Sequence, residues 1–407
     1  MQEDHNKPWH TEGWWTSPFN FRDEVREQLD LPERVRFHDV TLRDGEQTPG
    51  VVFRKDDKVH IAKLLDAAGV DRIEVAMPAV SPEDADAIAA VAGLGLNAEI
   101  YAFCRATATD IDIAADCGVD GVVIEVPAGM PRLQHQFPNW TADDVADKSM
   151  ASIAHAKERG LDVVFFLMDL SRADIDFADR LLSRVRDESP PDSIAVVDTS
   201  GCLLPQATEW LVKHVRQLTG LPVEIHTHTD LGLGVANALA AVAAGAGVVH
   251  ASVLGIGERT GNAPLEEVAA AVRTLYGCDI GVDLSLMTSL AKEISKISGF
   301  PRARNKPVTG THTFTRESGM GIELIRSQPL GLFCLDPKTV GQEPDYVLGK
   351  KSGLGSITLK LGDLGLEATD EQRPELLHRV KELGIEKRGP VDDDEFKALH
   401  SSVTGDS

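Results

Sequence analysis

Eight short apolar segments alternate with eight amphipathic segments between residues 35 and 275, and this alternation limits the possible folds more than any other feature. The apolar segments have the length and β-branched content of buried strands, whereas the segments between them have helical periodicity. The expected strands are 35–42, 71–76, 97–103, 120–126, 162–167, 193–198, 222–228 and 248–254. The expected helices are 55–68, 82–92, 109–116, 141–159, 171–187, 204–219, 233–245 and 264–275. Eight such pairs predict an α/β fold, a (β/α)8 TIM barrel with its active site where the strands end.

The remainder of the 407-residue chain is expected to flank this barrel. The pattern predicts a small, mostly helical C-terminal subdomain, with helical periodicity near 353–364 and 370–384. Residues 1–30 are interpreted either as an arm that docks on another subunit or as a partly ordered tail. The predicted division is an arm at 1–30, the TIM-barrel domain at 31–285, a linker or post-barrel segment at 286–325, the C-terminal subdomain at 326–400 and a tail at 401–407.

The charge and cysteine content limit the possible partners and location. The chain has 41 Lys and Arg residues against 64 Asp and Glu residues, a formal charge of -23, which disfavours binding to nucleic acid or to an anionic membrane. The five cysteines have no CxxC spacing, and neither a signal peptide nor an apolar run of membrane-spanning length is apparent. We therefore expect a cytoplasmic protein with free thiols.

Polar side chains follow the ends of several predicted strands. Because the strands of a barrel are parallel, these ends converge at one rim, where we expect one shared site. The residues concerned are Arg43, Asp44, Glu74, Arg105, Thr199, His226, His228 and Asn262.

The His226-Thr227-His228 sequence predicts a metal site. Two residues apart on a strand, the imidazoles project to the same side, and Asp44 can add an oxygen from across the barrel mouth. Such a mixed nitrogen and oxygen set suits a divalent cation such as Mn, Zn, Co or Mg. The alternative is that the histidines have a purely structural role.

Arg43 lies next to the predicted metal ligand Asp44. A fixed guanidinium at this position can stabilise an oxyanion that develops during a reaction. Alternatively, Arg43 only pairs with Asp39, Glu74 or Glu125.

Three motifs resemble the metal-dependent acyl-CoA condensing enzymes that include isopropylmalate, homocitrate and citramalate synthases. The motifs are LRDGEQTPG, HTHTDLGLGVANALAAVAAGA and GIGERTGNAPLEEV, and VLGKKSGLGS is similar to the post-barrel subdomain of the same family. The resemblance spans roughly residues 30 to 390. It implies a divalent-metal-dependent acyltransferase that forms a carbon–carbon bond between an acyl-CoA and a 2-oxo acid.

The resemblance also implies roles for individual residues. It implies that Asp44, His226 and His228 are metal ligands, with Asn262 as a further ligand or near neighbour. It implies that Arg43 stabilises the enolate oxygen and that Arg105 and Thr199 face the oxo-acid pocket. Glu74, at the same rim, is also expected to bind substrate. Members of this family are generally homodimers in which the post-barrel segment reaches the partner's site, so Arg316 would act in trans.

The sequence departs from the family pattern at the groups that manage protons. Met168 stands where a glutamate is usual, and Arg316 and Gly321 stand where two histidines are usual. Methionine takes up no proton, and arginine does not give one up. Glu125 is an added carboxylate that either repels an anionic substrate or serves as a base, and His312 is a candidate substitute for the missing histidine.

The same residues are also compatible with two other functions. The first is a metal-dependent aldolase or lyase that acts on a 2-oxo or 2-hydroxy acid without CoA. The second is a non-catalytic protein that binds a metal and a metabolite.

Overall fold

A computed structural model describes residues 7–405, which form two compact units. Residues 17–302 make one unit, and residues 7–16 with 303–405 make the other. The segment predicted as an N-terminal arm is therefore divided between the units, and its first six residues lie outside the described part of the chain.

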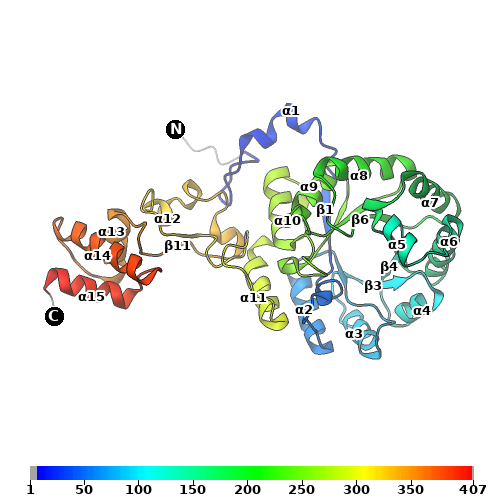
Figure 1. Ribbon diagram of the computed structural model, residues 1–407, viewed down its shortest axis with the longest axis horizontal. Coiled ribbons are helices and arrows are strands. Elements are labelled where there is room, and N and C mark those ends of the chain that lie inside the picture. The colour runs from blue at the N-terminus through cyan, green and yellow to red at the C-terminus, as the bar shows by residue number, and fades with distance from the viewer. Residues whose placement is uncertain (1–6, 406–407) are drawn as a thin grey trace. The chain divides into compact units, whose positions relative to one another are not determined.

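The larger unit is a closed parallel barrel, as the alternation predicted (Figure 1). Each strand pairs with the next along the chain, and β1 pairs with both β2 and β8, which closes the sheet. A short ninth strand pairs in parallel with the first two residues of β1. The strands are β1 Arg34–Asp39, β2 Arg72–Glu74, β3 Glu99–Arg105, β4 Gly121–Pro127, β5 Asp162–Met168, β6 Ser193–Asp198, β7 Val223–Thr227, β8 Val248–Ala251 and β9 Asp279–Ile280.

Helices surround the barrel strands (Figure 1). Several begin at a side chain that caps the first backbone N–H groups, including Ser81, Thr107, Thr141 and Asp174. The helices of this unit are α1 Asp23–Arg26, α2 Lys55–Ala67, α3 Pro82–Ala92, α4 Ala108–Asp116, α5 Met130–His135, α6 Ala142–Glu158, α7 Ile175–Glu188, α8 Pro205–Thr219, α9 Gly234–Ala243, α10 Leu265–Ala271 and α11 Met287–Ser298. The sequence did not predict α5, which lies in the connection between β4 and α6.

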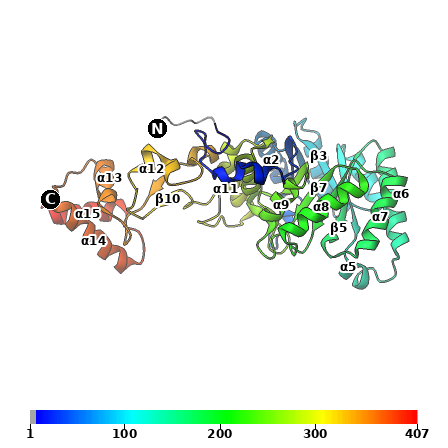
Figure 2. The same ribbon diagram turned by 90° about the horizontal axis from the view of Figure 1, so that it is seen from above.

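The smaller unit has its own apolar core, formed by buried residues that include Leu348, Ile357, Leu376 and Phe396. The three longer helices lie together in both views of this unit (Figures 1 and 2). Its elements are β10 Thr315–Arg316, α12 Leu324–Ser327, β11 Asp345–Tyr346, α13 Leu354–Leu364, α14 Gln372–Lys387 and α15 Asp393–Thr404.

The tail predicted from residue 401 is helical as far as Thr404, because these residues belong to α15. A capping box formed by Asp392 and Glu395 stabilises the start of this helix. Residues 406 and 407 lie outside the described residues. Between residues 7 and 405, no helix combines the length and the apolar character needed to cross a membrane.

Candidate active site

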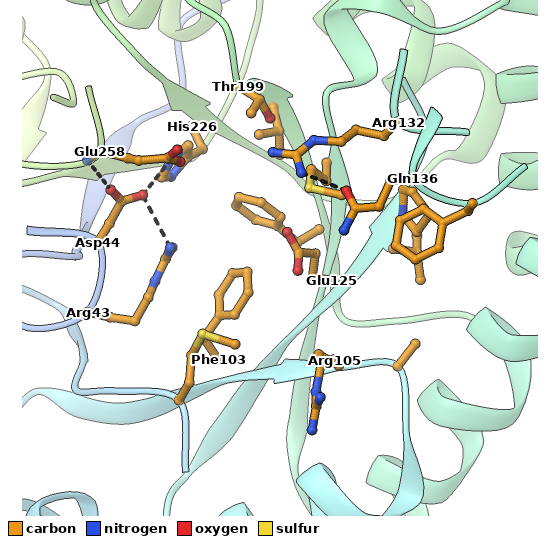
Figure 3. Close-up of a pocket in the computed structure, with 18 of the residues that line it drawn as sticks. Arg43, Asp44, Phe103, Arg105, Glu125, Arg132, Gln136, Thr199, His226 and Glu258 are labelled. Carbon is orange, nitrogen blue, oxygen red and sulfur yellow. Dashed lines mark hydrogen bonds and ion pairs between the residues drawn. The ribbon is translucent and has the colours of Figure 1, made fainter. Parts of the chain in front are cut away.

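Asp44, His226 and His228 converge at the end of the barrel strands, as predicted. Figure 3 shows Asp44 and His226 facing each other. Asp44 Oδ2 lies 3.5 Å from His226 Nε2 and 3.8 Å from His228 Nε2, and the two Nε2 atoms are 3.3 Å apart. All three side chains are buried. The three atoms thus lie within 4.8 Å of one another, close enough to bind one cation together.

The protonation states in this triad also suit a cation. Burial lowers the pKa of His226 to about 3, so the imidazole is neutral, which is the form that binds metals. Burial would raise the pKa of Asp44, but Arg43 and the two histidines outweigh it and hold this pKa well below its usual value. The carboxylate is therefore ionised and the imidazole of His226 is neutral at physiological pH.

Asn262 lies beside the triad, on the loop that follows β8. This residue forms an antiparallel bridge with His228, and its Nδ2 donates to Ile256 O at 3.1 Å. Its Oδ1 is buried and has no hydrogen-bond partner among the described residues. A Cβ at Gly257 would lie 2.3 Å from Asn262 Nδ2 and 2.9 Å from Asp44 Oδ1, so only glycine lets this loop approach so closely. The Oδ1 atom of Asn262 is therefore suited to be a further ligand of a cation at the triad.

The Nδ1 atoms of His226 and His228 have no hydrogen-bond partner within the described part of the chain. The second ring nitrogen of a metal-binding histidine usually donates to an acceptor that fixes the ring. Here aromatic packing positions His226 instead, because the Phe166 ring meets it edge-on at 5.1 Å between centroids.

Arg43 is fixed on three sides and has one free donor. Its Nε donates to Glu74 Oε1, its Nη1 donates to Asp44 Oδ2 at 3.2 Å, and its guanidinium lies 4.1 Å from the Phe103 ring centroid. The remaining nitrogen, Nη2, is buried without a partner among residues 7–405. The predicted pairing with Glu74 thus occurs, and it still leaves Nη2 available to donate to an oxyanion next to the triad.

Glu74 connects Arg43 to the barrel interior. His38 Nε2 lies 3.1 Å from Glu74 Oε2, and both side chains are fully buried. Burial would raise the pKa of Glu74, but Arg43 and His38 lower it to about 2. Glu74 is thus an ionised anchor beneath Arg43, and it does not line the cavity in which we expected it to meet substrate.

The interior histidine makes stability depend on pH. Burial, reinforced by His250, lowers the pKa of His38 to about 4 from an ordinary value of 6.5. In acid an unfolded chain gains this proton before the folded protein does. The contribution of neutral His38 to the stability of the folded protein is therefore complete above pH 6.5. As the pH falls to about 4, the free energy of unfolding decreases by roughly 3 kcal/mol, at about 1.4 kcal/mol per pKa unit.

We expect His38→Gln to remove that part of the pH dependence, because glutamine can still donate to Glu74 without titrating. Urea unfolding of the metal-free protein between pH 7 and pH 4 measures the effect. His60→Gln, at an exposed position, is the matched control. If the free energy of unfolding changed with pH equally in the wild type and in His38→Gln, the assignment of this pH dependence to His38 would be contradicted.

A cavity of about 500 Å³ opens beside the triad and Arg43. One part of its wall is apolar, with Met77, Phe103, Phe166, Met168 and Val197. Glu125 and Thr199 also line it, as do Arg132 and Gln136 from the connection between β4 and α6. The cavity thus combines the candidate metal site with an apolar wall and a second polar region.

Glu125 lies on β4 next to Phe166 of β5 and Arg105 of β3. In the view of Figure 3, its carboxyl group lies to the right of the Arg43–Asp44 pair and below the Arg132 guanidinium. Burial raises the pKa of Glu125, and Arg43 and Arg132 only partly offset this effect. A carboxylate with a raised pKa in a cavity is suited to accept a proton from a weakly acidic carbon.

Thr199 and Arg105 both line the cavity, but they differ in their contacts. Thr199 Oγ1 accepts a hydrogen bond from the backbone N–H of Asp169 at 2.8 Å. The Arg105 guanidinium binds both carboxylate oxygens of Asp110, at 2.8 Å each, and points away from Glu125 in Figure 3. The structure therefore does not bring the Arg105 charge to the triad.

The remaining predicted positions divide between the two units. Met168 lines the cavity at the end of β5, so the residue that stands in place of the family's glutamate is at the site. Arg316, His312 and Gly321 belong to the smaller unit, where Arg316 Nη2 donates to Met320 O at 3.1 Å. The catalytic role of Arg316 stays a prediction.

Four residues of α5 and the loop after it also line the cavity and were not predicted from the sequence, namely Arg132, Gln136, Phe137 and Trp140. One signal was available. The segment between the fourth predicted strand and the next predicted helix is long and contains an arginine and two aromatic residues.

Comparisons with known proteins agree with the fold. Residues 34–294 match the HMGL-like family model, and residues 308–388 match a model described as homocitrate synthase post-HMGL domain-like. In solved structures, a Bacillus subtilis HMG-CoA lyase aligns with a TM-score of 0.60 at 22% identity, over 68% of this chain and 98% of that chain.

Curated relatives match over most of the chain. Homocitrate synthase AksA of Methanopyrus kandleri is 39% identical, over 95% of this chain and 96% of the relative. A putative (R)-citramalate synthase CimA of Archaeoglobus fulgidus is 39% identical, over 89% and 74%. A 2-isopropylmalate synthase of Caldanaerobacter subterraneus is 36% identical, over 90% and 94%.

The fold and the triad define the class, a TIM barrel with a candidate metal centre where its strands end. Within that class the chain belongs to the HMGL-like family, together with the homocitrate, citramalate and isopropylmalate synthases.

Proposed function

We propose that this protein is an acyltransferase that condenses an acyl-CoA with a 2-oxo acid and forms a carbon–carbon bond. The names of its relatives support this class of reaction. The observation that carries the proposal is the position of Arg43 next to the Asp44, His226 and His228 triad, with an Nη2 that has no partner among residues 7–405. That arrangement fits a reaction in which an oxyanion develops beside a metal ion.

In this proposal, Asp44, His226 and His228 hold a divalent cation (Mn, Zn, Co or Mg), with Asn262 as a further ligand. The bound ion would supply Lewis-acid polarisation of the ketone of the oxo acid. Arg43 donates from Nη2 to the oxygen that gains negative charge, and Glu74 holds the guanidinium in place. Thr199, at the cavity wall, contacts the oxo acid.

Glu125 is the proposed base, because Met168 occupies the position where the family carries a glutamate. The Glu125 carboxylate removes a proton from the carbon next to the thioester carbonyl. That carbon then bonds to the ketone carbon, and the former ketone oxygen takes a proton to become a hydroxyl group. Water cleaves the thioester, which releases a carboxylate and the CoA thiol.

A thiol-release assay tests the proposal. A panel of 2-oxo acids with acetyl-CoA, in the presence of Mn²⁺, should release thiol only when an oxo acid is present. A carbonyl product from a 2-hydroxy acid without CoA would favour the aldolase or lyase alternative instead. The homodimer, the cytoplasmic location and the action of Arg316 in trans stay predictions.

A further inference from the structure

We infer that Arg132 and Gln136 form a subsite for a second anionic group of the oxo acid, so that the substrate carries a negative charge at both ends. This inference rests on the proposed function. It names the chemical class of the substrate and the residue that selects it.

The Arg132 side chain faces the cavity without a carboxylate partner among the described residues. Arg132 lies on α5, lines the cavity and is half-buried. Its Nη1 donates to Gln136 Oε1 at 2.7 Å (Figure 3), and no carboxylate in residues 7–405 lies within ion-pair distance of it. Gln136 turns its carbonyl oxygen to the arginine and so orients the guanidinium without neutralising it.

Arg132 differs in this respect from other arginines near the same end of the barrel. Arg105 at the same cavity binds Asp110, and Arg172 on the loop after β5 binds Asp169. A cation that faces a cavity without such a carboxylate can bind one that the ligand supplies. Guanidinium–carboxylate pairs form short, charge-assisted and often bidentate hydrogen bonds.

Arg132 and Gln136 line the same cavity as the proposed reacting groups. Arg43 and the triad line one part of the cavity, and in Figure 3 the Arg132 guanidinium lies to the right of the Arg43–Asp44 pair and above Glu125. An uncharged side chain of an oxo acid would displace water from the Arg132 guanidinium without replacing the hydrogen bonds that the water accepts. A carboxylate would replace them, so the subsite discriminates against uncharged analogues.

Two other roles for Arg132 are possible, and the experiment separates both from the subsite. The anion could be a phosphate of CoA, since Lys148 and Trp140 also line this cavity, with Lys148 Nζ 5.1 Å from the Trp140 ring centroid. Alternatively, Arg132 could act only on Glu125, whose pKa it lowers.

The experiment uses two oxo acids of equal length, 2-oxoglutarate with a second carboxylate and 2-oxopentanoate without one. Calorimetric titrations in buffer with Mn²⁺ give the affinity of the full-length protein for each acid and for CoA. The variants are Arg132→Gln and, as a control with the same loss of charge, Arg180→Gln. Arg180 is exposed on α7 and lies outside this cavity.

We expect the wild type and Arg180→Gln to bind 2-oxoglutarate roughly 10- to 100-fold more tightly than 2-oxopentanoate, from one or two charge-assisted hydrogen bonds. Arg132→Gln should lose this preference and bind CoA unchanged. Equal affinities of the wild type for the two acids, or a preference that persists in Arg132→Gln, would overturn the inference. It would also be overturned if Arg132→Gln weakened only CoA binding, or lowered kcat equally with both acids at unchanged affinities.

Thiol release measured in parallel separates this inference from the proposed function. A preference for 2-oxoglutarate that depends on Arg132, without thiol release from any acyl-CoA, supports the subsite and refutes the condensation. Thiol release at equal kcat/KM with both acids supports the condensation and refutes the subsite.

Discussion

The Asp44→Asn variant is expected to lose at least roughly 10³-fold in kcat/KM for thiol release, a loss of about 4 kcal/mol in transition-state stabilisation. The change removes the only charged ligand of the triad, and the Oδ1 atom can still accept its hydrogen bond from the backbone N–H of Glu258. The loop after β8 therefore keeps its contact, while the site loses the negative charge that attracts a cation.

Elemental analysis of dialysed protein provides a second readout for Asp44→Asn. The variant should retain far less Mn²⁺ than the wild type while its circular dichroism spectrum stays the same. Asp179→Asn is the matched control, because Asp179 pairs with His214 on the outer helices, away from the cavity. If Asp44→Asn retained wild-type activity and metal content, the assignment of the triad would be wrong.

The second large effect concerns Glu125. A general base contributes roughly 10²- to 10⁴-fold to a rate, so Glu125→Gln should lower kcat by about that factor. Glutamine has nearly the same size as glutamate, and KM for the oxo acid should change much less than kcat. In D2O the wild type should exchange the methyl protons of acetyl-CoA when a non-reactive oxo-acid analogue is bound, and Glu125→Gln should not.

The pH profile gives an independent check on Glu125. The base acts only when it is ionised, and burial raises its pKa above the ordinary 4.5. The kcat of the wild type should therefore fall on the acidic side with an apparent pKa above 4.5. A Glu125→Gln variant within a few-fold of wild-type kcat would show that another group removes the proton.

The barrel and the triad could be predicted because each depends on a regular pattern. Buried parallel strands appear in the sequence as short apolar runs between helical segments, and closure brings their ends together whatever the loops contain. His226 lies on β7 and His228 directly follows its last residue, Thr227, so the two histidines occupy alternate positions of an extended segment and project to the same side. Asp44 could be placed at the same rim because it follows β1 in the sequence.

The contacts of individual arginines could not be predicted in the same way. Arg105 was expected at the oxo acid, yet it binds Asp110, which lies at the third position of α4 beyond the Thr107 cap. Arg132 was missed because α5 is only six residues long, too short for a helical period to be recognised. The local signal for α15, an aspartate three residues before a glutamate at 392–395, was present in the sequence.

The most direct test of the central claim is a carbon-13 NMR measurement of the product formed from acetyl-CoA labelled at the methyl carbon. Condensation predicts that, as thiol is released, the label appears in a methylene group next to a hydroxyl-bearing carbon of the former oxo acid. If the label appeared only in free acetate, the protein would be a thioester hydrolase, and the proposed carbon–carbon bond formation would be contradicted.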